Sequence, residues 1–118
     1  MTTIKEAVTD MLSNHAISVE EAADRHFSPG FRQKTNGHWD DRAGFVARID
    51  ELRRVTTLVS INVLNEMVEG RHYAERHTID LLGADGRHIV LEVYLFATFD
   101  SAGKFHRIEE ANFSLSEG

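Results

Sequence analysis

The chain has 118 residues, is 42% hydrophobic and 27% charged, contains no cysteine and carries a formal net charge of −6. This length and composition suit one globular domain with a single core, so we expect one domain over residues 1–118. The lack of cysteine excludes disulfides, thiolate catalysis and cysteine-ligated metal sites, and the acidic balance argues against nucleic acid as a partner, because nucleic acids bind basic surfaces.

Neither a targeting segment nor a membrane-spanning segment is apparent. The segment 1–15 lacks a basic region followed by an apolar run, and no segment approaches the ~18 apolar residues that a spanning helix needs. We therefore expect a cytoplasmic protein that has no membrane partner.

Two capping signals near the N-terminus predict two short helices. Thr3 and Glu6 have capping-box spacing and lead into apolar residues at helical intervals. Ser18 and Glu21 repeat this spacing, and the second helix must stop near Pro29, the single proline of the chain. The chain is therefore expected to open with two consecutive helices.

A short extended stretch, a loop and a third helix are expected next. Residues 31–39 show no helical period, and their Asn36-Gly37 pair favours a turn. Asp40 or Asp41 then caps a helix whose apolar side chains recur on one stripe. These side chains are Phe45, Val46, Ile49 and Leu52.

The second half of the chain predicts four long strands. Its segments are rich in β-branched and aromatic residues and are separated by short connections that contain glycine. Strands joined in this way pair as antiparallel hairpins, so the expected class is α+β, with three N-terminal helices packed on an antiparallel sheet. The four segments are residues 56–68, 71–82, 88–99 and 104–115.

Strands of about a dozen residues form a sheet that must curl strongly. Three short helices cover only its concave side, and a pocket between helices and sheet is the expected site for a small apolar ligand. Strand 88–99 is apolar on both faces, so we expect a second copy of the chain to cover the convex face in a homodimer. One face carries Ile89, Leu91, Val93, Leu95, Ala97 and Phe99, and the other carries Val90, Tyr94 and Phe96.

Two short motifs resemble a known family. Phe31-Arg32-Gln33 with the nearby Asn36 is similar to the tyrosine–x–glutamine–histidine–asparagine segment of the SnoaL-like branch of the nuclear transport factor 2-like superfamily. Gly103-Lys104-Phe105 resembles the glycine–lysine–isoleucine start of that family's last strand. The resemblance covers nearly the whole chain and implies a cone-shaped, cystatin-like α+β fold with a strongly curved antiparallel sheet, a deep apolar pocket and usually a dimer.

The resemblance also implies roles for particular residues. Family members include polyketide cyclases, ketosteroid isomerase-like and limonene epoxide hydrolase-like enzymes, and binding domains. In the cyclase-like and hydrolase-like members an acidic acid–base residue lies seven positions after the glycine of the last motif, which is Glu110 here. Arg76 resembles an arginine of the hydrolase-like members, but Thr78 stands in place of their aspartate, and Phe31 replaces the tyrosine of the first motif.

Strand alternation extends this candidate set. If Glu110 faces the pocket, Ile108 and Asn112 face it too. On strand 71–82 we expect Arg76 and Thr78 on the pocket side, with Arg76 either orienting a ligand oxygen or pairing with Glu110 or Asp80. The remaining candidate ligand contacts are Phe31, Gln33, Trp39 and Tyr94. Structural alternatives for these are a solvated Gln33, a Tyr94 that closes a core edge and a Trp39 that packs on the third helix.

Two main functional hypotheses follow. The first is a small-molecule-binding pocket protein that acts as a cofactor-independent isomerase, cyclase or hydratase or hydrolase on an apolar ligand, with Glu110 and Arg76 as catalytic residues. The second is a non-catalytic ligand-binding or dimerisation domain of the same fold, and a third is an interaction adaptor that uses the convex face.

The seven histidines lack the spacings typical of metal ligands, and no phosphate-binding loop is present, so neither a metal nor another cofactor is expected.

Overall fold

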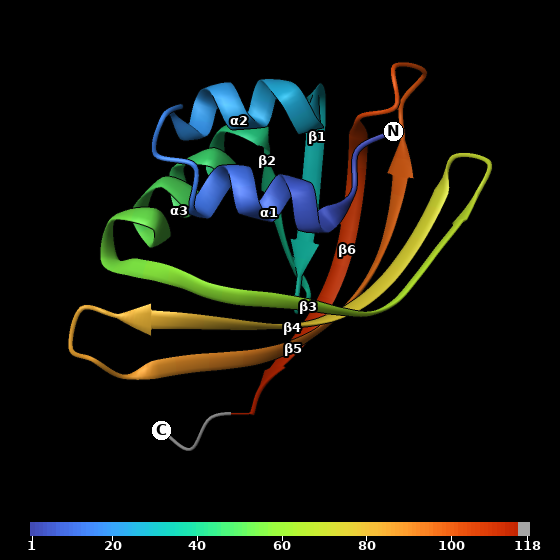
Figure 1. Cartoon of the computed structure of the whole chain (residues 1–118). Coiled ribbons are helices and arrows are strands. Elements are labelled where there is room, and N and C mark those ends of the chain that lie inside the picture. Colours follow the sequence, from blue (N-terminus) through green and yellow to red (C-terminus); the bar gives the residue numbers. More distant parts are fainter. Residues whose placement is uncertain (116–118) are drawn as a thin grey trace.

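All three predicted helices form, and they lie together on the concave side of one curved sheet (Figure 1). The computed structural model describes residues 1–115. The helices are α1 (Ile4–Leu12), α2 (Val19–His26) and α3 (Arg42–Val55). Each begins at a side chain that accepts a hydrogen bond from the first turn, namely that of Thr3, Ser18 or Asp41. No helix among the described residues is long and apolar enough to cross a membrane.

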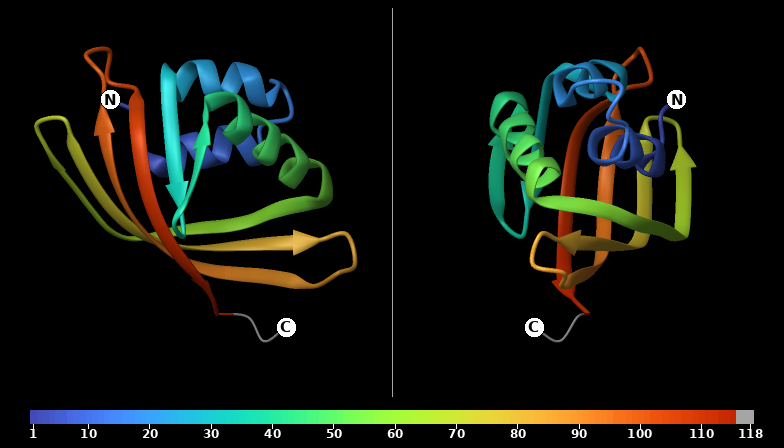
Figure 2. Two further views of the ribbon diagram at one scale, coloured as in Figure 1. Left: turned by 180° about the vertical axis from the view of Figure 1, so that it is seen from behind. Right: turned by 60° about the vertical axis from the view of Figure 1, so that its left-hand side comes forward.

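The sheet has six strands in the order β2-β1-β6-β5-β4-β3 and bends sharply around the helices (Figure 2). Neighbouring strands are antiparallel except β1 and β6, which pair in parallel. The predicted α+β class with a curved, mainly antiparallel sheet is therefore confirmed. The strands are β1 (Phe27–Thr35), β2 (His38–Asp41), β3 (Thr56–Glu69), β4 (His72–Gly83), β5 (His88–Phe99) and β6 (Phe105–Ser114).

The segment expected to be a short extended stretch and a loop is instead a hairpin of two strands. Strand β1 begins directly after His26, and the turn at Asn36 and Gly37, with φ of 49° and 88°, leads into β2. Two consecutive positive φ values are the geometry that favours an Asn-Gly pair in a tight hairpin. The local sequence does not show β1 clearly because its pairing with β6 joins segments that lie far apart in the chain.

Aromatic rings fill the core on the concave side. Phe31 packs between Phe27 and Phe45, with ring centroids 4.4 and 5.0 Å apart. Phe105 has no exposed surface and packs on Phe99 and Tyr73, at centroid distances of 4.9 and 5.3 Å. Offset and edge-to-face ring pairs add to the stabilisation from burial alone. The first ring group packs α3 against β1, and the second joins β4, β5 and β6.

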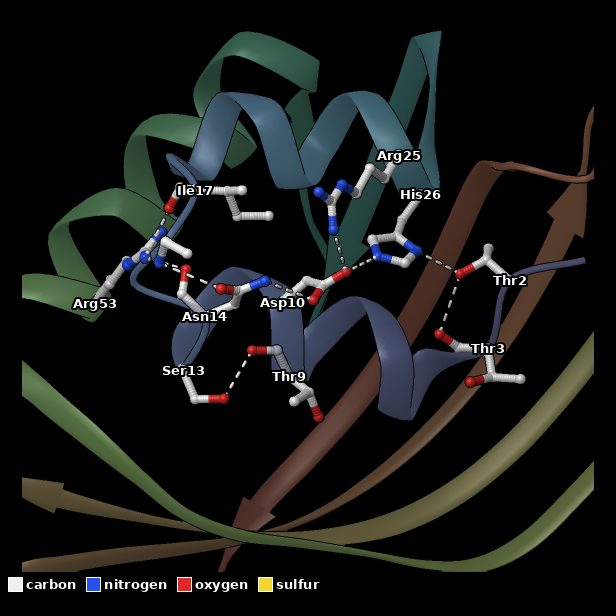
Figure 3. A network of polar contacts seen from close by, with 11 residues as sticks. Thr2, Thr3, Thr9, Asp10, Ser13, Asn14, Ile17, Arg25, His26 and Arg53 are labelled. Carbon is white, nitrogen blue, oxygen red and sulfur yellow. Dashed lines mark hydrogen bonds and ion pairs between the residues drawn. The ribbon is translucent and has the colours of Figure 1, made fainter.

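A polar network joins α1, α2 and the segment that precedes α1 (Figure 3). The buried His26 ring lies 2.6 Å from Asp10 Oδ2 through Nε2 and 2.6 Å from Thr2 Oγ1 through Nδ1. Hydrogen bonding to His26 holds the pKa of Asp10 below its ordinary value. Arg53 of α3 donates hydrogen bonds to the carbonyl oxygens of Asn14 and Ile17. These contacts fix the three helices relative to one another.

Phe105→Ala tests the core. Removing a fully buried ring leaves a void, so we expect a loss of about 3–5 kcal/mol in the free energy of unfolding, measured by urea denaturation. Val55→Ala, at the exposed end of α3, is the control and should cost much less. Equal losses in the two variants would contradict the packing described here.

Candidate functional site

A cavity of about 180 Å³ lies between the helix layer and the concave face of the sheet. Apolar side chains of α1, α3, β4 and β5 form most of its wall. Polar side chains come from the neighbouring strands β1 and β6, and one each comes from β4 and α3. These are Gln33, Thr35, Arg48, His77, Glu110 and Asn112.

Glu110 is a partly desolvated carboxylate in this wall. Its Oε2 accepts a hydrogen bond from Asn112 Nδ2 at 2.9 Å, and its Oε1 accepts one from Gln33 Nε2 at 3.4 Å. Burial raises the pKa of Glu110 above its ordinary value, although the hydrogen bond from Asn112 and the charges of His77 and Arg48 oppose the shift. A raised carboxyl pKa suits proton transfer near neutral pH.

A second buried acid–base pair lies on β4. His77 Nδ1 lies 2.7 and 2.9 Å from the two carboxylate oxygens of Glu75. The side chain of Glu75 has no exposed surface and that of His77 is 5% exposed. His77 lines the cavity, and among residues 1–115 its ring makes hydrogen bonds only to Glu75. Because Arg76 and Thr78 were expected on the pocket side of this strand, strand alternation put Glu75 and His77 on the opposite face, and the sequence interpretation missed them.

The structure brings together four of the residues expected around the pocket. Glu110, Gln33, Ile108 and Asn112 line the cavity, on adjacent positions of β6 and β1. Phe31 lies in the core between two other phenylalanines and is not part of the cavity wall. The expected polar residues Glu110, Gln33 and Asn112 therefore come together at the cavity, but Phe31 does not join them.

Four expected contacts lie on the convex face instead. Arg76 donates a hydrogen bond to Asn65 and lies over the ring of Tyr94, so it does not pair with Glu110. Thr78 occupies the same face of β4. Trp39 neither covers the pocket nor packs on α3, because its ring lies against the guanidinium groups of Arg32 and Arg107. The placement of Arg76, Thr78, Tyr94 and Trp39 at the pocket was therefore wrong.

The reversal on β4 has a physical reason. Tyr73, Ile79 and Leu81 are the buried large apolar residues of this strand and occupy odd positions, whereas Leu82, at an even position, is only partly buried. Burying them turns Glu75 and His77 inward and Arg76 outward, since side chains alternate along a strand. The apolar alternation was the available signal, and the resemblance of Arg76 to a family arginine concealed it.

No three histidine, aspartate or glutamate side chains of residues 1–115 gather closely enough to hold a metal ion. Glu75 and His77 contact one another, and Glu110 contacts amide groups. The arrangement can therefore accept and donate protons at two places in one apolar cavity.

Glu110→Gln tests the desolvation of the carboxylate. When folding raises the pKa of a glutamate, that residue does not lower the free energy of unfolding at a pH below its pKa in the unfolded chain. The free energy of unfolding falls as the pH rises through the pKa in the folded chain, because the buried carboxyl group then ionises. We therefore expect the variant to match the wild type in acid and to exceed it in unfolding free energy at neutral pH, as measured by urea denaturation across pH. A wild type that gained stability over the variant as the pH rose would contradict the direction of the shift.

Comparison with known proteins places the fold. No protein-family model matches the sequence, and neither does any curated protein. A candidate isomerase from Rhodopseudomonas palustris has a TM-score of 0.75 at 13% identity, over 95% of this chain and 91% of its own. A candidate SnoaL-like polyketide cyclase from Mesorhizobium loti has a TM-score of 0.62 at 15% identity, over 92% and 98% of the two chains. A candidate isomerase of the SnoaL-like family from Agrobacterium tumefaciens has a TM-score of 0.64 at 11% identity, over 90% of each chain.

At these identities the likeness concerns the fold. The helices on the concave side, the sheet that curves around them and the coverage of nearly whole chains agree with the resemblance seen in the sequence. The chain therefore shares its fold with these solved structures, two of which are described as SnoaL-like.

Proposed function

We propose that the cavity is an acid–base site in which Glu110 moves a proton on a small, mainly apolar ligand without a cofactor. The observation that supports this most is a carboxylate with a pKa raised by burial in a wall that is otherwise largely apolar. Gln33 and Asn112 donate to its two oxygens and hold it in place. A positioned base of this kind accelerates proton transfer by about 10²–10⁴-fold.

The size of the cavity limits the ligand. An apolar cavity of about 150 Å³ holds benzene, whereas pockets for drug-sized ligands begin near about 300 Å³. A volume of about 180 Å³ therefore suits one ring or a short branched chain. Isomerisation, cyclisation and hydration all include a proton transfer that Glu110 can perform, and similar folds carry isomerase and cyclase names.

Proton exchange at carbon tests the proposal with simple ketones in place of the natural substrate. The protein is incubated in D₂O with cyclohexanone, cyclohexenone and acetophenone, and deuterium at the α-carbon is followed by NMR. We expect exchange above the buffer rate with at least one ketone, and a loss of about 10²-fold or more in Glu110→Gln, because the base is removed.

Glu109→Gln is the matched control, since it removes the same charge one residue away on the convex face. It should retain the exchange rate. Buffer-level exchange with every ketone, or equal rates in the two glutamine variants, would contradict the proposal. Ketone binding in NMR without exchange would favour a non-catalytic binding domain, the second hypothesis.

We further propose that the convex face pairs with a second copy of the chain. Phe96 is 73% exposed at its centre, and Tyr94 and Phe113 stack beside it. Basic and acidic side chains occur on both halves of this face, since Arg76 lies on β4 and Glu92 on β5, while Arg107 and Glu109 both lie on β6. Pairing with the same face of a second copy across a two-fold axis would bury the exposed aromatic side chains at its centre.

Phe96→Glu tests the dimer. In sedimentation velocity we expect the wild type at twice the mass of one chain and the variant at the mass of one chain, because the charge would be buried in the apolar centre of the interface. Val55→Glu, at the exposed end of α3, should leave the mass unchanged. A wild type that sediments as a monomer would contradict the dimer.

A further inference from the structure

Glu75 and His77 form an ion-paired or hydrogen-bonded unit that the proposed role of Glu110 does not use. Their side chains are almost fully buried, and both oxygens of Glu75 contact His77 Nδ1, at 2.7 and 2.9 Å. Burying two ionisable groups costs free energy unless they are paired and hydrogen-bonded. With Nδ1 engaged by Glu75, Nε2 is the ring nitrogen that remains for a ligand, and the ring lines the cavity.

The pair faces Glu110 across one strand. Glu75, Leu95 and Glu110 occupy one cross-strand row, and His77, Val93 and Asn112 occupy the next. Strands β4 and β6 are therefore separated by β5, which sets their backbones roughly 10 Å apart. Apolar Leu95 and Val93 form the floor between them. A ligand that lies on this floor contacts the carboxyl group on one side and the imidazole on the other.

Other charges around the imidazole are few. Glu110 is close enough for its charge to interact with those of His77 and Arg48. Arg48 of α3 forms an ion pair with Asp40 at 3.0 Å. Glu75 is thus the carboxylate in direct contact with His77, and Glu110 is the one that lies across the floor.

We propose that the Glu75–His77 pair is the oxygen-binding half of the cavity, so that the site takes small enolisable carbonyl compounds and their stable oxyanion analogues, the phenols. This inference rests on the proposed function of the same cavity. In the proposed state the pair is a Glu75 carboxylate and a His77 imidazolium, whose ring carries a proton on each nitrogen. His77 is the catalytic residue of the pair, because its Nε2–H donates a hydrogen bond to the ligand oxygen. Glu75 is a positioning residue that fixes the ring and the proton on Nδ1.

The proposed step balances in atoms and charge. Glu110 in its ionised form removes the proton from the α-carbon, the C–H electron pair forms the new C=C bond, and the carbonyl π electrons move to oxygen. The resulting enolate oxygen accepts the hydrogen bond from His77 Nε2–H. Glu110 becomes neutral as the ligand becomes negative, so the charge enclosed in the cavity does not change. An enolate formed beside a fixed donor in an apolar site is strongly stabilised.

Binding of 4-nitrophenol tests the inference without any catalysis. Its anion absorbs in visible light, so a titration reports both affinity and ionisation of the bound phenol. We expect binding to the wild type and at least tenfold weaker binding to His77→Gln and Glu75→Gln, with partial rescue in Glu75→Asp. The exposed His88–Asp80 pair, with Nδ1 2.7 Å from Oδ1, joins β5 to β4 and provides matched controls in His88→Gln and Asp80→Asn, which should bind as the wild type does.

A measurement on the wild type covers the case in which a variant fails to fold. In ¹⁵N NMR of the histidine ring, we expect His77 to carry a proton on both ring nitrogens and its Nε2 signal to shift when 4-nitrophenol is added. An unperturbed His77 signal with bound 4-nitrophenol, no binding at all, or equal affinity in His77→Gln would overturn the inference. Binding that depends on His77 without any ketone exchange would instead refute the role of Glu110 and leave the oxygen-binding half in place.

Discussion

The alternation of side chains along β4, β5 and β6 controls which residues reach the cavity. Each of these strands packs one face against the helices, and the large apolar residues decide which face that is. On β5 the choice buries Val93 and Leu95 and leaves Phe96 outside. On β6 it turns Ile108 and Glu110 inward, so the position of the carboxylate follows from the packing of its apolar neighbour.

The same constraint explains how polar groups come to occupy an apolar wall. A strand that must bury Tyr73 and Ile79 also buries the two residues between them that share their face, Glu75 and His77. They are tolerated because each satisfies the other. Among residues 1–115, the direct hydrogen-bond partners of Glu110 are amide donors, and its ionised form is disfavoured by burial. Of these two carboxylates, Glu75 is paired with His77, whereas Glu110 lines the cavity and is available for chemistry.

Much of the fold could be predicted from local patterns. The three helices carry capping residues and apolar stripes, and the four long strands carry β-branched residues and glycine-containing connections. Strand β1 and its parallel pairing with β6 could not be predicted, because the contact depends on residues distant in the chain. For the site, Glu110 was found through the resemblance and the alternation of β6. The face of β4 was misjudged because charged residues occur on both of its faces, so Arg76 looked as suitable as His77 until the burial of Tyr73 and Leu81 was known.

The proposed chemistry depends on Glu110 being a desolvated carboxylate in an apolar, ligand-accessible cavity. The most direct measurement is a pH titration of its side-chain ¹³C carboxyl signal, with and without 4-nitrophenol. We expect a midpoint above the ordinary glutamate value of about 4.3, and a further change of the titration when the ligand fills the cavity. A signal that titrates like that of a free glutamate and ignores the ligand would contradict this role of Glu110.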